Sequence, residues 1–141
     1  MALTKKQRVE LKLKFGGKCA YCGCELPEKG WHADHVKPVL RLSEIDEVGR
    51  SKGIFKLKNT GEVAHRDREH FDNYYPSCAP CNLFKATWSI EGFRNQVSAQ
   101  VSRAREYSVN FRTAERFGLI EPVSKPVIFW FETYLNDSEV V

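Results

Sequence analysis

Two pairs of cysteines constrain this 141-residue chain more than any other feature of its sequence. Cys19 and Cys22 form one C-x-x-C motif, and Cys78 and Cys81 form another. Two thiolates separated by two residues can bind one metal ion from a single turn, and two such turns supply the tetrahedral ligand set of closed structural zinc sites. A shared ion would join distant segments, so its binding free energy would contribute to folding. We therefore expect a structural Zn²⁺ site at these four cysteines.

Two other interpretations of these cysteines remain open from the sequence. A C-x-x-C pair can act as a redox dithiol, and buried cysteines can pack as small hydrophobic side chains. Disulfide bonds are less favoured, because the N-terminal residues carry charges and no apolar signal-peptide core. We expect a cytoplasmic location, where thiols stay reduced. Cys24, the fifth cysteine, is expected to be a bystander beside the metal site.

The composition is typical of a soluble globular protein, and the charge distribution is compatible with a polyanionic partner. The hydrophobic content is 42% and the charged content is 28%, as in ordinary soluble domains. No run of about 18 apolar residues occurs, so no membrane partner is expected. The net charge is +4, and basic residues cluster in 1–18 and 50–58. Such stretches suit nucleic acid, although a solvated helix face and a solvated loop would give the same pattern.

Local signals predict several helices and strands. Thr4 and Gln7 match a capping box at the start of a first helix, and Gly16-Gly17 can end it. Residues 31–36 are predicted to form a short strand, and Pro80 suits the first turn of a helix. We further expect a hairpin within 55–63, an amphipathic helix along 89–104, a shorter helix in 110–118, and a final strand at 127–134 paired with 119–123.

A shared metal ion would bring two polar stretches together. These are HADHVKP (32–38) and DNYYPSCAPCNLFK (72–85), which carry His32, Asp34, His35, Asp72, Asn73, Asn82 and Lys85. An imidazole can take a proton from water near neutral pH. Oxygen ligands can hold a hard divalent cation, which stabilises negative charge on a phosphate. Near a basic surface, these are the groups that phosphodiester hydrolysis needs.

The pattern CAYCG … HADHVKP … DNYYPSCAPCNLFK resembles the HNH nuclease motif, in the subgroup whose ββα-metal core is tied by a four-cysteine zinc site. The match covers roughly residues 15–90. The region after Ser89 is similar, more loosely, to the tail of small phage-encoded HNH proteins. The resemblance implies a single α+β domain over 1–141. It would have an N-terminal helix, a zinc-crosslinked HNH core at about 15–90 and a helix-plus-strand extension at about 91–141.

The resemblance also implies a role for each matched residue. His35 would be the general base, and Asn73 would position the catalytic loop and the His35 ring. Asp34 and Asn82 would hold a catalytic Mg²⁺ or Mn²⁺, and Lys85 would contact a DNA phosphate. The implied reaction is metal-dependent hydrolysis of DNA that leaves 5′-phosphate and 3′-hydroxyl ends.

Two features depart from the family pattern. Asn82 stands where the family often has histidine, and an amide oxygen is a harder ligand than imidazole. We therefore expect a preference for Mg²⁺ or Mn²⁺ over Ni²⁺ or Zn²⁺. The segment 37–72 is long and partly basic, and it is either a DNA-binding insertion or a flexible loop. In the first case its lysines Lys52, Lys56 and Lys58 would contact DNA.

Strand geometry affects the remaining histidines. On a regular strand Asp34 and His35 point to opposite faces, so the strand must bend or end there if both act on one phosphate. His32 shares the face of Asp34 and is a further candidate for a metal or phosphate contact. His70 is a second candidate because it lies close to Asn73 in the sequence, although a solvated loop histidine is the simpler interpretation.

Two rival functions come from other classes. One is a non-catalytic DNA-binding or DNA-packaging accessory protein, with phage packaging proteins as partners. The set Asp34, His35, Asn73 and Asn82 weighs against it, because binding alone does not need these residues. The other is a structural zinc module for protein contacts, which the two basic stretches disfavour. The target sequence, nicking versus double-strand cleavage and the oligomeric state do not follow from the sequence.

Overall fold

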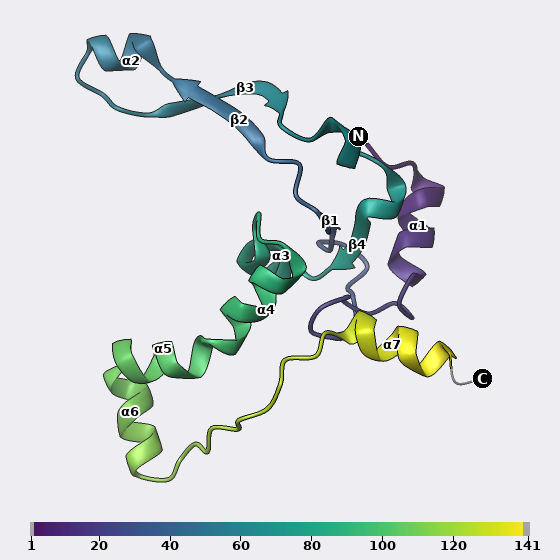
Figure 1. Cartoon of the computed structure of the whole chain (residues 1–141), viewed down its shortest axis with the longest axis vertical. Helices are drawn as coiled ribbons and strands as arrows, with labels where there is room; N and C mark the ends of the chain where they lie inside the picture. Colours follow the sequence, from purple (N-terminus) through teal and green to yellow (C-terminus); the bar gives the residue numbers. More distant parts are fainter. Residues whose placement is uncertain (1, 140–141) are drawn as a thin grey trace.

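Two short antiparallel strands and one helix form the centre of the fold (Figure 1). Strand β1 (His32–His35) pairs with β4 (Tyr74–Ser77), so that His35 lies opposite Tyr74. Helix α3 (Ala79–Lys85) follows β4, with Pro80 in its first turn, and contacts β1. The predicted strand at 31–36 and helix near Pro80 are confirmed in this computed structural model, which describes residues 2–139.

Helix α1 (Lys5–Leu13) begins at the predicted capping box. The Thr4 side chain accepts a hydrogen bond from the Gln7 amide, and the Gln7 side chain accepts one from the Thr4 amide. The next two glycines have positive φ angles of 75° and 79°, a conformation that lets the chain leave the helix. Leu11 in the helix and Phe15 just after it are buried, so the end of α1 is anchored in the core.

An aromatic cluster forms the middle of the hydrophobic core. The ring of Tyr21 packs edge-on against Phe93 and Phe129, with centroids 5.2 Å and 5.5 Å away. Phe93 and Phe129 stack on each other at 5.2 Å. These three residues come from the turn after Cys19, from a helix and from the chain near the C-terminus. The cluster therefore joins segments that are far apart in the sequence.

Residues 41–63 form an arm that extends away from β1 and β4 (Figure 1). It consists of β2 (Arg41–Ile45), α2 (Glu47–Ser51) and β3 (Leu57–Val63), with β2 and β3 antiparallel. The predicted hairpin within 55–63 is wrong, because this segment is one strand paired with β2. The pairing register of β2 and β3 changes between Arg41, which pairs with Val63, and Ser43, which pairs with Asn59. Gly61 lies in the intervening residues and has a φ of 81°. Asn59-Thr60-Gly61 thus forms a bulge in the strand instead of a turn.

Two short one-turn helices lead from the arm back to β4. They are η1 (Arg66–Arg68) and η2 (Phe71–Asn73). The amide of Asn73 donates to the carbonyl of His70, and its carbonyl accepts from the amide of Val36. The return path of the chain is thereby fixed beside the end of β1.

The C-terminal part of the described chain is helical. It contains α4 (Ile90–Ser98), α5 (Gln100–Tyr107), α6 (Val109–Arg116) and α7 (Trp130–Glu139). The predicted helix over 89–104 is divided at Ala99, and the predicted helix in 110–118 is confirmed as α6. No helix among the described residues is long and apolar enough to cross a membrane.

The predicted final strand at 127–134 is wrong, and so is its pairing with 119–123. Trp130 begins α7, and its amide donates to the carbonyl of Tyr21. The amide of Phe131 donates to the carbonyl of Ala20, and the Glu132 side chain accepts from the Phe129 amide. These bonds satisfy the first turn of a helix, so tertiary contacts override the strand preference of the aromatic residues. The extension is helical and carries no strand within 119–139.

Arg94 fastens α7 to α4. Its guanidinium donates to both carboxylate oxygens of Glu132, at 2.5 Å and 3.0 Å, and to the carbonyl of Val127 at 2.7 Å. It also lies over the Phe129 ring at 4.8 Å from the centroid. The hydrogen bond from Arg94 lowers the pKa of Glu132.

Glu132→Gln is therefore expected to destabilise the protein by about 1–2 kcal/mol at neutral pH, because a charge-assisted pair becomes a neutral contact. The folded state holds the pKa of Glu132 below its unfolded value of about 4.3. The contribution is present above that value and is lost as the pH falls through the folded pKa. Urea unfolding at pH 7 and at pH 3 measures both effects. Glu115→Gln is the control, because the Glu115–Arg105 pair is more exposed and its loss should change stability little.

Candidate functional site

Four cysteines gather at the start of α3. The Sγ atoms of Cys19, Cys22, Cys78 and Cys81 all lie within 4.8 Å of one another. Cys19 and Cys78 are buried, whereas Cys22 is exposed. Thiolates around one tetrahedral Zn²⁺, with Zn–S bonds of about 2.3 Å, lie about 3.8 Å apart, so small shifts of these side chains would complete the ligand set. The four cysteines are therefore positioned to hold a metal ion, as the sequence predicted.

The pKa values of two thiols in this cluster shift in opposite directions. A hydrogen bond from Cys81 lowers the pKa of Cys19 to about 4, and the same bond raises the pKa of Cys81. Because cysteines bind metal as thiolates, an ion that bound there would displace the remaining thiol protons. Cys24 is exposed and lies outside the group of four.

Asn73 connects the end of β1 to the chain that leads into β4. It is 6% exposed, and its Nδ2 donates to the carbonyls of Lys37 and Arg68, both at 2.9 Å. Its Oδ1 accepts from the Lys37 amide at 2.9 Å. A buried amide with three such bonds fixes two backbone segments at once. Asn73 thus holds the loop that follows His35.

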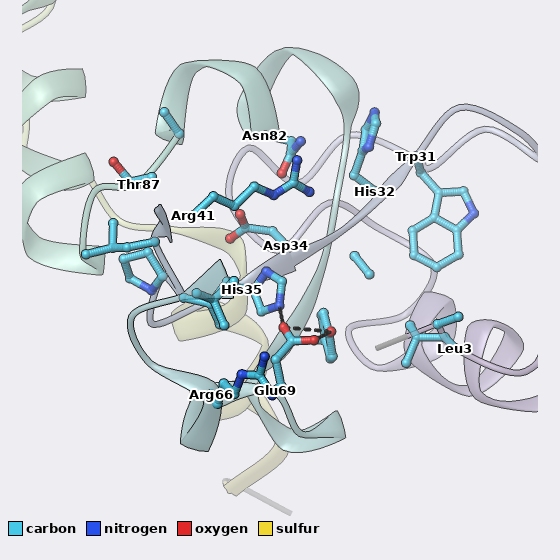
Figure 2. A pocket seen from close by; sticks show the side chains of 18 of the residues that line it. Leu3, Trp31, His32, Asp34, His35, Arg41, Arg66, Glu69, Asn82 and Thr87 are labelled. Carbon is cyan, nitrogen blue, oxygen red and sulfur yellow. Dashed lines mark hydrogen bonds and ion pairs between the residues drawn. The ribbon is translucent and has the colours of Figure 1, made fainter. Parts of the chain in front are cut away.

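His35 lies at the end of β1, on one wall of a cleft of about 1280 Å³. Its Nε2 is bonded to a carboxylate oxygen of Glu69, and its ring lies 4.6 Å from that of Tyr74. In Figure 2 the other ring nitrogen points away from Glu69, toward the side with Asp34 and Asn82. When Nε2 carries the hydrogen that Glu69 accepts, Nδ1 is left as a proton acceptor. In that tautomer Nδ1 faces the cleft and could accept a proton there.

Asp34 uses one carboxylate oxygen for the protein and leaves the other accessible. Its Oδ2 accepts from the Tyr21 hydroxyl at 2.5 Å and from the Lys85 ammonium at 3.0 Å. Its Oδ1 has no hydrogen-bond partner among the described residues. No buried side-chain oxygen of these residues lacks a partner, so Oδ1 is accessible, and Asp34 lines the cleft. Burial raises the pKa of Asp34, and the Lys85 charge opposes that shift. Asp34 thus presents Oδ1 as a potential ligand for a cation.

The expected contact between Lys85 and a DNA phosphate does not fit the structure. The Lys85 side chain is completely buried, and its ammonium donates to the carbonyl of His35 at 2.9 Å as well as pairing with Asp34. Since α3 packs on β1, the lysine points inward, where the buried carboxylate of Asp34 needs a cation. Lys85 thus fixes the positions of Asp34 and His35 on β1.

The remaining predicted residues are divided between the cleft and other places. Asn82 and His32 line the cleft (Figure 2). His70 lies in a separate depression of about 250 Å³ with Asn73 and Asp72. The three lysines of the arm are exposed and do not line the cleft. Two of them pair with acids: Lys56 lies 3.7 Å from Asp46, and Lys58 lies 3.3 Å from Glu44. Lys52 pairs with no acid among the described residues.

Sequence reasoning missed the residues that orient the site. Glu69 holds the His35 ring, and Tyr21 holds Asp34. Glu69 lies in the charged stretch AHRDREH, where nothing distinguishes it from its neighbours. Tyr21 lies inside the CAYC motif, so its place next to a metal ligand was the one available signal.

Metal binding is expected to require the four clustered cysteines and not the fifth. The wild-type protein should carry one zinc ion per chain. Cys19→Ser should lose the ion and several kcal/mol of stability, because binding free energy contributes to folding. Cys24→Ser should keep both. Elemental analysis and circular dichroism of purified proteins measure these outcomes, and retention of a stoichiometric ion by Cys19→Ser would contradict the assignment.

Lys85→Met is expected to destabilise the protein by about 3–5 kcal/mol, because it leaves the Asp34 carboxylate buried without its cation. The double variant Asp34→Asn/Lys85→Met removes both charges and should recover a large part of this loss. Urea unfolding at pH 7 measures the difference. A single variant within about 1 kcal/mol of wild type would mean that the pair is not structurally important.

Comparison of this chain with protein-family models, with curated proteins and with solved structures finds no match. The site is therefore interpreted from its own residues. What the structure establishes is a mixed α+β fold with small antiparallel sheets and a four-cysteine cluster that could hold a metal ion.

Proposed function

We propose that this protein is a metal-dependent DNA endonuclease or nickase of the HNH type. The observation that carries the proposal is the environment of His35. Glu69 binds one ring nitrogen, and the other faces a cleft shared with Asp34 and Asn82. A histidine held by a carboxylate beside two oxygen ligands is suited to activate water near a cation.

The order and packing of the elements support the same proposal. Strands β1 and β4 are antiparallel, and α3 follows β4 and contacts β1. The resemblance implies this order of two strands and a helix for an HNH core. The cysteine cluster lies at the start of α3, so a zinc ion there would fix the helix that carries Asn82.

In the proposed reaction His35 removes a proton from a water molecule as the water oxygen attacks phosphorus. The bond from phosphorus to the 3′ oxygen breaks, and the leaving oxygen takes a proton from solvent. The products are a 5′-phosphate and a 3′-hydroxyl. Glu69 keeps the ring oriented and stabilises the imidazolium that forms, as a carboxylate does for a catalytic histidine in other enzymes.

Asp34 Oδ1 and the side-chain oxygen of Asn82 would hold the catalytic Mg²⁺ or Mn²⁺. Such an ion stabilises negative charge on the phosphate and on the leaving oxygen. Oxygen ligands fit these hard ions better than they fit Ni²⁺ or Zn²⁺. Tyr21 and Lys85 bind the other oxygen of Asp34 and thereby fix the direction in which Oδ1 points.

The proposal predicts that zinc-loaded protein nicks or linearises supercoiled plasmid with Mg²⁺ or Mn²⁺ and is less active with Ni²⁺. His35→Ala should lower the rate about 100-fold or more, because the general base is lost. His70→Ala is the matched control, since His70 lies outside the cleft, and its rate should stay near wild type. Agarose-gel time courses measure the rates, and zinc content and circular dichroism verify that each variant is folded.

Equal cleavage by wild type and His35→Ala would contradict the proposal. Absence of cleavage by a wild-type protein that still binds DNA would favour the rival function, a non-catalytic DNA-binding or packaging accessory protein. Absence of both cleavage and salt-dependent DNA binding would favour a zinc module for protein contacts.

A further inference from the structure

Three arginines line the cleft around His35, and none is paired with a carboxylate among the described residues. Arg8 comes from α1, Arg41 from the start of β2, and Arg66 from η1. All three are exposed. Arg8 is already placed over the Trp31 ring, 4.4 Å from its centroid. Arg41 and Arg66 are therefore the guanidinium groups of the cleft that have no side-chain partner among residues 2–139.

The acidic groups of the cleft do not neutralise these two arginines. The carboxylate of Asp34 is balanced by the buried ammonium of Lys85. That leaves Glu69, bonded to the imidazole of His35, as the one remaining carboxylate among the described residues of the cleft lining, against three arginines. The accessible charge of the cleft is thus positive. Guanidinium groups in a concave site attract anions and can donate two parallel hydrogen bonds to a phosphate.

The backbone at the base of the arm fixes the start of β2. Leu40 has a φ of 52°, in the left-handed region that a bulky residue rarely adopts. Its carbonyl accepts from the Ala64 amide at 2.9 Å, and the carbonyl of Val39 accepts from the His65 amide at 3.2 Å. The strained residue is thereby held between two cross-strand bonds directly before Arg41. Such strain persists where the surrounding structure enforces it and is frequent at functional sites.

The two arginines lie on different sides of His35. Figure 2 shows Arg41 reaching across the cleft over Asp34 toward Asn82, whereas Arg66 lies on the side of Glu69. Arg41 is thus on the side of the oxygen ligands, and Arg66 is on the side of the group that orients the base. A nucleic-acid strand that crosses His35 would pass both side chains.

We propose that Arg41 and Arg66 bind consecutive backbone phosphates of a DNA strand on the two sides of His35, with Arg41 on the side of Asp34 and Asn82. They take the place that the sequence had suggested for Lys85, which is buried. The inference rests on the proposed function in one respect, namely that the ligand is DNA. On this proposal DNA is bound by the base of the arm and by η1, and not by Lys52, Lys56 and Lys58 farther along the arm.

The test uses zinc-loaded His35→Ala protein and a fluorescein-labelled 20-base-pair DNA duplex, without added Mg²⁺. Fluorescence anisotropy is recorded from 50 to 200 mM KCl. Adding Arg41→Gln or Arg66→Gln should weaken binding about 10-fold each, because a charge-assisted phosphate contact is lost. Each should also reduce the slope of log K against log salt by about 0.9. Arg103→Gln on α5 removes the same charge from an exposed position outside the cleft and should leave both values unchanged.

Unchanged affinity and salt slope in both cleft variants would overturn the inference, and so would the absence of DNA binding by the His35→Ala parent. An effect of Arg103→Gln equal to that of the cleft variants would also overturn it, because the cleft would then be no more than part of a diffuse basic surface. Arginine-dependent binding together with a wild-type protein that fails to cut plasmid would uphold the inference and refute the nuclease proposal.

Discussion

The buried ion pair between Asp34 and Lys85 connects the parts of the candidate site. Lys85 lies at the end of α3, and its ammonium binds both the Asp34 carboxylate and the carbonyl of His35. A buried pair of this kind contributes little net stability, since desolvation of both charges offsets their attraction. It contributes geometry, because any other arrangement would leave a charge buried and unpaired. The strand that carries His35 is therefore held in a fixed position against the helix that carries Asn82.

Helix α3 is too short to be stable on its own and depends on contacts at both ends. At its start Cys78 and Cys81 belong to the four-cysteine cluster, and at its end Lys85 is bound to β1. Asn82 lies between these two attachments. The position of its side chain is thus determined by the cysteine cluster and the ion pair together, which explains how a small fold can present an amide side chain in a defined place.

Local signals in the sequence were sufficient where the stabilising contacts are local. The capping box of Thr4 and Gln7 and the C-x-x-C spacing depend on residues a few positions apart, and both were predicted. The final strand at 127–134 was predicted wrongly, because carbonyl groups of residues 20 and 21 accept the bonds that allow α7 to begin at Trp130. The interior position of Lys85 and the role of Glu69 depend likewise on distant partners, which no pattern in the neighbouring residues reveals.

The charges of the site explain why metal and substrate would depend on each other. Lys85 already balances the carboxylate of Asp34, and Asn82 is neutral. A divalent cation at Asp34 Oδ1 would therefore meet little remaining negative charge in the protein, and Arg41 nearby adds a further positive group. Coulomb repulsion between these cations is strong at short range in a partly desolvated cleft. A DNA phosphate supplies the missing negative charge for both. In the proposed enzyme the substrate thus completes the metal site, and the divalent ion and the DNA bind more tightly together than either does alone.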